Sequence, residues 1–224
     1  MRSAPALDGA YLSYPLDDLL GELALESVRA RCLVIGEDLG TVPDGIREKL
    51  AAANVLSYRV LWFERHGENF APASFYPRKA VACASTHDLP TLAGWWSGAD
   101  IAEKFALGLI APEAADAEGM RRRDDKQSLL KLLTQENLTP PAVDMEAPLD
   151  PGLAEAIHAF LKKTPSVLAM IQLDDLLGEI TSVNLPGTDR ERLNWRRKLA
   201  REATEELRRI GLAGQKENVI RRMI

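Results

Sequence analysis

Four short apolar runs limit what this chain can fold into more than any other feature of its sequence. They span residues 32–35, 58–63, 80–84 and 167–171, and polar residues rarely alternate within them. A strand with one face in water alternates apolar and polar side chains, so these runs indicate strands covered on both faces, as in a parallel α/β sheet. Consecutive β/α units usually pair as neighbours. We therefore expect four parallel strands, adjacent in chain order.

Helical patterns fill the stretches between these runs. Apolar residues repeat at three- and four-residue spacing over residues 16–28, and a second helix opens near Thr41. Thr188 and Glu191 fit a capping box for a final helix over residues 199–210. Between the third and fourth runs, a helical stretch of about 99–165 contains patterns at 101–109, 120–133 and 153–163. The alternation of helices and strands predicts the α/β class.

The composition excludes several classes of function. The 224 residues carry a formal charge of −5, from 28 basic and 33 acidic side chains. A nucleic-acid surface needs a basic patch and a membrane span needs about 20 apolar residues, and the sequence has neither pattern. We therefore expect no nucleic acid and no membrane as partners. Cys32 and Cys83 lie in or beside apolar runs without a CxxC neighbour, so we expect buried free thiols and a cytoplasmic protein.

Polar side chains follow each of the four runs. Glu37 and Asp38 come after the first run, and His87 and Asp88 come after the third. One acid after a strand is usually a turn or cap residue. Functional side chains of α/β proteins, however, gather at the carboxyl ends of parallel strands, and here all four ends are polar. The other two ends carry Glu64, Arg65 and His66, and Gln172, Asp174 and Asp175.

Paired carboxylates without a metal-binding or phosphate-binding motif favour glycosidic chemistry. In such chemistry one carboxylic acid protonates the leaving oxygen, and a second carboxylate attacks or stabilises the cationic sugar carbon. The sequence contains no HExxH, no glycine-rich phosphate loop and no GxSxG motif. Trp95 and Trp96 follow Asp88 closely. They are either core aromatics or a platform for the C–H face of a sugar ring.

Five segments together resemble the amylomaltase, or 4-α-glucanotransferase, family. They are "GAYLSYPLDDLL", "VIGEDLGTVP", "STHDLPTLAGWW", "VNLPGT" and "NWRRKL", and they occur in the family's order from Gly9 to Leu199. The resemblance implies a retaining enzyme on a (β/α)8 barrel that transfers α-1,4-glucan segments. It implies that Glu37 is the acid/base, that Asp88 is the transition-state stabiliser and that His87 is its sugar-binding neighbour. Asp38 is then a structural partner.

The resemblance covers strands five to eight of such a barrel, so the whole stretch 1–224 reads as the C-terminal half of a catalytic barrel with a helical insertion at about 99–165. The family's nucleophile is an aspartate in an R-x-D-H-type motif on the fourth strand, and this sequence has no such motif. Asp8, the only earlier acid, has no strand before it. We therefore expect no transfer activity from these 224 residues alone.

The expected partners follow from the resemblance. They are α-1,4-glucans and maltooligosaccharides, together with the missing barrel half or a second copy that pairs through open sheet edges. No metal and no cofactor is expected. We also expect the carboxyl groups of Glu37 and Asp88 to lie within about 10 Å of each other, since both must flank one sugar ring. The alternatives are a non-catalytic half-barrel that binds glucan or a partner, and an unrelated α/β hydrolytic enzyme.

Overall fold

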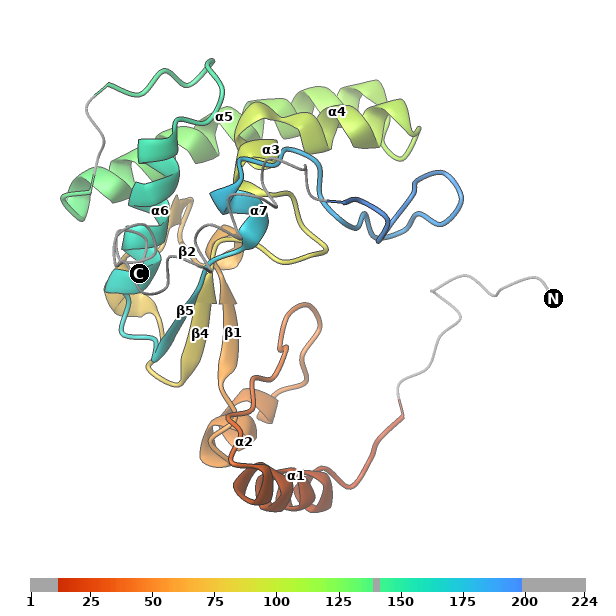
Figure 1. Cartoon of the computed structure of the whole chain (residues 1–224), viewed down its shortest axis with the longest axis vertical. Helices are drawn as coiled ribbons and strands as arrows, with labels where there is room; N and C mark the ends of the chain where they lie inside the picture. Colours follow the sequence, from red (N-terminus) through yellow and green to blue (C-terminus); the bar gives the residue numbers. More distant parts are fainter. Residues whose placement is uncertain (1–11, 139–141, 199–224) are drawn as a thin grey trace. The chain divides into compact units, whose positions relative to one another are not determined.

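The computed structural model describes residues 12–138 and 142–198, in two compact units. The first unit is Met1–Ser57 and the second is Tyr58–Ile224 (Figure 1). Asp8 and the predicted helix over 199–210 lie outside the described residues. Among the described residues, no helix combines the length and the apolar character that a membrane crossing requires.

From residue 12 onward, the first unit holds two helices and a short extended segment. Helix α1 (Leu16–Ala30) and helix α2 (Ile46–Ala52) confirm the two predicted helices. The predicted strand at 32–35 is wrong in extent, because only Ile35 forms a bridge, a parallel one with Leu56. Cys32 is exposed rather than buried. With one bridge in place of a ladder, this apolar run gains little cover from within its own unit.

The second unit is built on a three-stranded sheet. Its strands are β1 (Ser57–Val60), β4 (Ala80–Cys83) and β5 (Leu168–Met170), in the order β1-β4-β5. Strands β4 and β5 are parallel, with Val81, Ala82 and Cys83 opposite Leu168, Ala169 and Met170. The predicted neighbour order and the predicted parallel pairing of the last two runs are therefore confirmed.

Two features of this sheet differ from the prediction. The run at 58–63 leaves the strand after Val60, and Leu61–Phe63 forms a 3-10 helix. An unpredicted antiparallel hairpin follows, formed by β2 (Arg65–His66) and β3 (Asn69–Phe70). Its turn uses Gly67, whose φ of 61° is accessible to glycine without steric cost.

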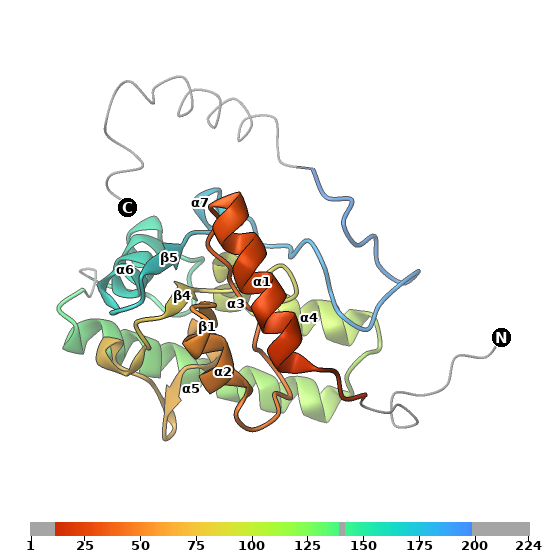
Figure 2. The ribbon, with the colours of Figure 1, turned by 90° about the horizontal axis from the view of Figure 1, so that it is seen from below.

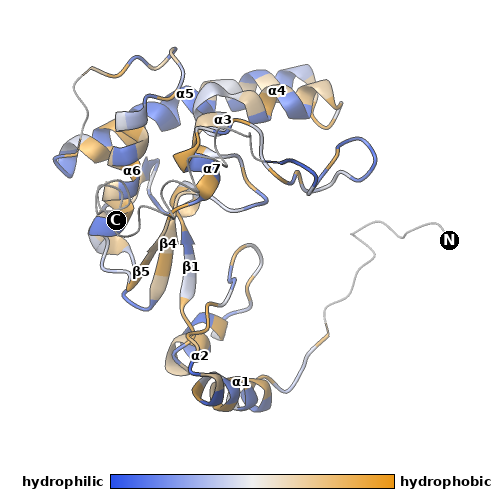
Figure 3. Cartoon of the chain, viewed as in Figure 1, coloured by the Kyte–Doolittle hydropathy of each residue, from blue (hydrophilic) through white to orange (hydrophobic). Residues whose placement is uncertain are grey.

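Burial differs strongly between the two parallel strands. All four residues of β4 are buried, as predicted, whereas all three residues of β5 are exposed. Both strands are apolar, while β1 is more hydrophilic (Figure 3). The prediction that the last run is covered on both faces is therefore wrong for these residues, which lie on an edge strand with exposed side chains.

Helices fill the region between β4 and β5. They are α3 (Leu92–Ser97), α4 (Ala99–Ala106), α5 (Pro112–Gln135) and α6 (Pro151–Lys163), and a short α7 (Leu173–Leu176) follows β5. The predicted helical patterns at 101–109, 120–133 and 153–163 are confirmed by α4, α5 and α6, whereas α3 and α7 were not predicted. Asp150 caps α6 through the backbone N–H groups of Gly152 and Leu153. Helix α6 packs against β4 and β5 (Figures 1 and 2).

The predicted capping box at Thr188 does not start a helix within the described residues, which end at Lys198. The Thr188 hydroxyl donates to the carbonyl of Leu185 at 2.6 Å, and the Glu191 carboxylate accepts from the N–H of Asp189 at 2.9 Å. Both side chains thus stabilise a turn, because hydroxyl and carboxylate groups can bond nearby backbone in turns as well as at helix starts.

Candidate functional site

The loop that carries Glu37 is fixed by the residue beside it. Asp38 is 4 % exposed, and its carboxylate accepts hydrogen bonds from Arg47 Nε at 3.0 Å and Ser57 Oγ at 2.8 Å. Arg47 also donates to the carbonyl oxygen of Asp38 at 2.9 Å. The N–H of Gly36 donates to the carbonyl of Leu56 at 2.8 Å. These bonds stabilise the loop from within its own unit, and they support the structural role expected for Asp38.

Glu37 itself is exposed. Its carboxylate accepts a hydrogen bond from the N–H of Leu39 at 3.0 Å, within the same loop. A carboxylate with one local backbone partner keeps lone pairs and solvent access available for a ligand. The arrangement therefore suits a group that exchanges protons.

The loop after β4 divides its polar residues in the same way. Ser85 and Thr86 are buried, and the Ser85 hydroxyl donates to the carbonyl of Pro90 at 2.6 Å. The N–H of Asp88 donates to the Thr86 hydroxyl at 3.2 Å. The side chains of His87 and Asp88 are exposed, at 59 % and 46 %. The buried hydroxyl residues thus hold a loop that presents an imidazole and a carboxylate.

The same loop is tied to the segment around α7. Thr91 caps α3 by accepting from the N–H of Gly94, and its hydroxyl donates to the carbonyl of Glu179 at 2.5 Å. Asp175 accepts from the N–H of Leu92 at 2.9 Å. A Cβ on Gly94 would lie 2.2 Å from the carbonyl oxygen of Ile180, so only glycine permits this approach of α3.

Asp175 also faces a buried histidine. His158 Nε2 on α6 lies 3.6 Å from Asp175 Oδ2, and both side chains are almost completely buried. Burial lowers the pKa of His158 to about 4 and raises the pKa of Asp175 to about 6. The pair is therefore not a charged salt bridge at neutral pH, because the histidine is neutral there. These groups support the loop and are not accessible to a ligand.

Asp88 is held by a residue far along the chain. Asn184 Nδ2 donates to Asp88 Oδ1 at 2.6 Å, and His87 Nε2 lies 3.4 Å from Asp88 Oδ2. Asn184 belongs to the "VNLPGT" segment, from which no site residue was predicted. Two motifs nearly one hundred residues apart therefore meet at one carboxylate. We call Asp88, His87 and Asn184 the Asp88 cluster.

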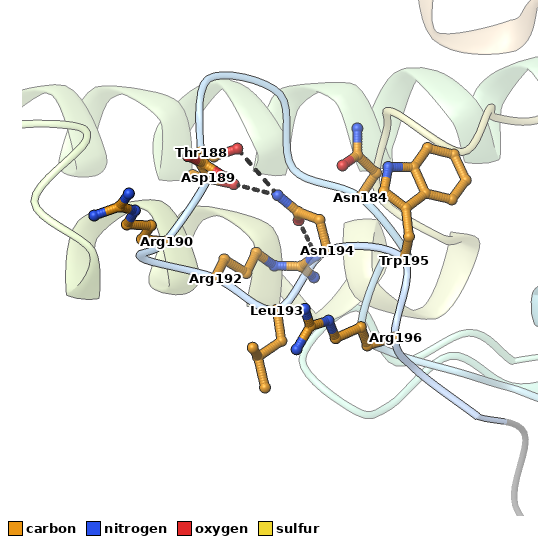
Figure 4. A pocket seen from close by; sticks show the side chains of 9 residues that line it. All are labelled: Asn184, Thr188, Asp189, Arg190, Arg192, Leu193, Asn194, Trp195 and Arg196. Carbon is orange, nitrogen blue, oxygen red and sulfur yellow. Dashed lines mark hydrogen bonds between the residues drawn. The ribbon is translucent and has the colours of Figure 1, made fainter.

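A pocket of about 530 Å³ begins at Asn184 and continues along the following segment (Figure 4). Arg192 connects this segment to α4, and Asn194 stabilises the segment internally. Arg192 donates to the carboxylate of Glu103 at 2.7 Å, and Asn194 donates to the hydroxyl of Thr188 at 2.8 Å. The pocket is lined by Asn184, Thr188, Asp189, Arg190, Arg192, Leu193, Asn194, Trp195 and Arg196.

Trp195 was not predicted as a site residue. The residue is 61 % exposed, and its ring centroid lies 5.2 Å from that of His87. The signal available in the sequence was the tryptophan of "NWRRKL" itself, a large aromatic in an otherwise polar segment. Trp95 and Trp96 were predicted instead, because they follow Asp88 closely in the sequence.

Trp95 and Trp96 are core residues. They are 5 % and 1 % exposed, and Trp95 stacks on Trp62 with ring centroids 4.2 Å apart. Trp96 Nε1 donates to the carbonyl of Ala147 at 3.0 Å, and Arg122 lies over the Trp95 ring. Their burial supports the core interpretation rather than the sugar platform, because neither ring offers a free face to a ligand.

The remaining strand ends do not form a comparable cluster. Glu64 pairs with Arg59 at 3.5 Å, and Asp174 pairs with Arg197 at 2.5 Å, both as contacts between partly buried groups. His66 packs on Phe75, with ring centroids 4.7 Å apart. The Glu37–Asp88 separation stays a prediction, because the two residues belong to different units.

The parallel sheet and the exposed carboxylate after β4 define the chain as an α/β protein of the kind that carries its polar site at strand ends. Comparison with known proteins makes the class specific. A family model for 4-alpha-glucanotransferase matches residues 2–204. The chain belongs to the 4-alpha-glucanotransferase family.

Proteins similar to this chain in sequence carry the name of this family. The chain is 42 % identical over 202 residues to a 4-alpha-glucanotransferase of Haemophilus influenzae, and covers 29 % of it with 89 % of its own length. It is 33 % identical over 198 residues to one from Mycobacterium bovis, and covers 27 % of it with 86 % of its own length.

Two solved structures are also similar. The amylomaltase from Corynebacterium glutamicum matches 83 % of this chain and 27 % of its own chain, with a TM-score of 0.76 and 32 % identity. The amylomaltase from Streptococcus agalactiae in complex with acarbose matches 92 % of this chain and 35 % of its own, with a TM-score of 0.57 and 17 % identity, a likeness of fold alone. The chain thus spans less than a third of the curated relatives' length.

Proposed function

We propose that this chain supplies the acid/base and the transition-state stabiliser of a 4-α-glucanotransferase acting on α-1,4-glucans and maltooligosaccharides. The observation that carries the proposal is the Asp88 cluster, in which an exposed carboxylate is oriented by Asn184 at 2.6 Å and lies beside His87. Family membership supports the reaction class, and the relatives bear the name of that activity.

Glu37 is the proposed proton donor. In the first step it protonates the glycosidic oxygen that leaves, while an aspartate nucleophile forms the glycosyl–enzyme bond. In the second step the resulting carboxylate takes the proton of the incoming sugar hydroxyl as that oxygen attacks the sugar carbon, and the glycosyl–enzyme bond breaks to release the aspartate as a carboxylate. The exposed Glu37 side chain, with one local hydrogen bond to Leu39, supports both roles.

Asp88 is the proposed stabiliser of the positive charge that develops on the sugar ring. Its carboxylate remains an acceptor toward Asn184, so its position is fixed before the charge develops, which lowers the cost of reorganisation. We further propose that α4, α5 and α6 form a helical insertion of the catalytic barrel, at about 99–165.

The nucleophile is the part that these residues do not supply, since the sequence contains no R-x-D-H motif. We expect the 224-residue protein to release no glucose from maltotriose. The same residues should release glucose when they are joined to or co-expressed with a family segment that carries the motif. We call this combination the completed enzyme. Losing one member of a concerted catalytic set costs roughly 10⁴–10⁶ in rate. Robust transfer by the 224 residues alone would contradict the proposal, and so would no transfer by the completed enzyme.

A further inference from the structure

Four tryptophans occur in the sequence, and they fall into two groups. Trp62, Trp95 and Trp96 are buried, at 8 %, 5 % and 1 % exposed, and pack together. Trp195 is 61 % exposed. A tryptophan left in water forgoes the large gain of burying an aromatic side chain, so its position requires an explanation beyond packing.

The backbone at Trp195 adds a second observation. Its φ is +61°, in the left-handed region that a bulky side chain adopts only at a steric cost. The conformation is held by the N–H of Trp195, which donates to the carbonyl of Val183 at 2.9 Å. Residues kept in such conformations cluster at binding and catalytic sites, where the surrounding structure holds them.

The surroundings of Trp195 indicate what its ring binds. The ring lies 5.2 Å from His87, and the neighbour of Val183, Asn184, donates to Asp88. Trp195 and Asn184 both line the same pocket (Figure 4), and Asn184 connects it to the Asp88 carboxylate. Hydrogen-bonding groups next to a free aromatic face match a sugar, which offers hydroxyl groups at its rim and C–H groups on its face.

We propose that Trp195 is a glucan-binding residue, whose exposed indole stacks on a glucose unit next to the unit that His87 and Asp88 bind. This inference rests on the proposed function and assigns the sugar platform to Trp195 in place of Trp95 and Trp96. The left-handed backbone aims the ring, and Arg192 and Asn194 hold the segment that carries it.

The exposed position of Trp195 provides a direct test with the 224-residue protein. Acrylamide should quench the fluorescence of Trp195 and leave the three buried tryptophans largely unquenched. Maltoheptaose should protect the quenchable fraction, and Trp195→Phe should remove that fraction. Quenching that maltoheptaose does not change would contradict the inference.

Substitutions separate binding from folding. Calorimetry with maltoheptaose should show binding weakened about tenfold or more by Trp195→Ala and by Trp195→Gly, and changed less than threefold by Trp195→Phe. Trp195→Gly relieves the left-handed conformation, so its unfolding midpoint should be no lower than that of Trp195→Ala. A structural role for the indole predicts instead that both variants unfold well below the wild-type midpoint, because both lose its packing.

Phe75 is a matched control. It is 55 % exposed and packs on His66 at 4.7 Å, so it is also an exposed aromatic beside a histidine after a strand run. Phe75→Ala should leave maltoheptaose binding unchanged. Wild-type affinity in Trp195→Gly, as expected if Trp195 contacts another protein segment, would overturn the inference, and so would no binding by the wild-type chain. The glucose-release assay on the completed enzyme tests the proposed function separately.

Discussion

The loops that carry Glu37 and Asp88 are built alike, although they belong to different units. In each, two neighbouring polar residues have opposite environments. Asp38 is buried and bonded to Arg47, while Glu37 is exposed. Thr86 is buried and accepts from the backbone of the loop, while Asp88 is exposed. A buried polar side chain thus fixes each loop, and an exposed neighbour is free for chemistry.

The loops differ in how the exposed carboxylate is held. Asp88 accepts from Asn184, a residue from another motif, whereas Glu37 accepts from the N–H of Leu39 in its own loop. A group that only stabilises charge benefits from a fixed position. A group that gives and takes protons must approach two different oxygens in turn. The two carboxylates therefore differ in hydrogen bonding in the way that the two proposed roles require.

The largest effect is expected at the fixed carboxylate. In the completed enzyme, Asp88→Asn should lower kcat by at least about 10³-fold, because the amide carries no charge to stabilise the sugar cation. Maltooligosaccharide affinity should change little, since the amide keeps the shape. Asp124→Asn, at an exposed position on α5, is the matched control and should retain full kcat. Equal rates for the two variants would remove Asp88 from the mechanism.

The buried pair behind the Asp88 loop should show itself in the pH dependence of stability. The pKa of His158 is lowered to about 4, so its contribution is present above pH 6.5 and is lost as pH falls toward 4. The pKa of Asp175 is raised to about 6, so its contribution is present below pH 3.8 and is lost as pH rises through 6. These two contributions nearly cancel between pH 4 and 6.

Single substitutions remove one contribution at a time. Relative to wild type, Asp175→Asn should lose about 3 kcal/mol of unfolding free energy as pH falls from 6.5 to 4, because only the histidine term remains. His158→Gln should show the opposite slope, with a loss of similar size as pH rises from 4 to 6. Urea titrations across this range measure both. Slopes of the same sign in the two variants would contradict the assignment.

The anchor of the Glu37 loop should matter less, because its partner Arg47 is half exposed and can regain water. Asp38→Ala should lower the unfolding free energy by about 2 kcal/mol. Asp17→Ala, which breaks the exposed ion pair with Lys49 in the same unit, should cost below about 0.5 kcal/mol. Chemical denaturation compares the two. Equal costs would mean that burial of Asp38 does not stabilise the loop.

The smallest effect is expected at Asn184. Its amide orients Asp88 and leaves the charge unchanged, so Asn184→Ala should lower kcat about tenfold in the completed enzyme. Initial rates of glucose release measure the change. A loss as large as that of Asp88→Asn would mean that Asn184 does more than position the carboxylate.

The sequence predicted the parts of this structure that depend on local patterns. The helices α1, α2, α4, α5 and α6 follow from periodicity, and the neighbour order of the last three runs follows from chain order. The exposed Glu37 and the buried Asp38 agree with the roles that the motif implies, an acid/base and a structural partner. The sequence missed features that depend on distant contacts. No sequence pattern near Asn184 reveals its hydrogen bond to Asp88. Trp95 was predicted as a sugar-binding residue because it is close to Asp88 in the sequence, but it is buried against Trp62. The prediction that the last apolar run is buried was wrong for a similar reason, because an apolar sequence alone does not distinguish a central strand from an edge strand.

The central claim is that Glu37 is the proton donor and Asp88 is the stabiliser. The most direct test uses a substrate whose leaving group needs no protonation. Fluoride departs from α-maltosyl fluoride without help from an acid, whereas the leaving glycosidic oxygen of maltotriose needs a proton donor. In the completed enzyme, Glu37→Gln should cut maltotriose cleavage by at least about 10³-fold. It should still release the first equivalent of fluoride at nearly the wild-type rate, measured by a fluoride electrode. Asp88→Asn should lose both reactions, and Glu48→Gln should lose neither. Equal losses on both substrates for Glu37→Gln, or fluoride release at the wild-type rate by Asp88→Asn, would contradict the account.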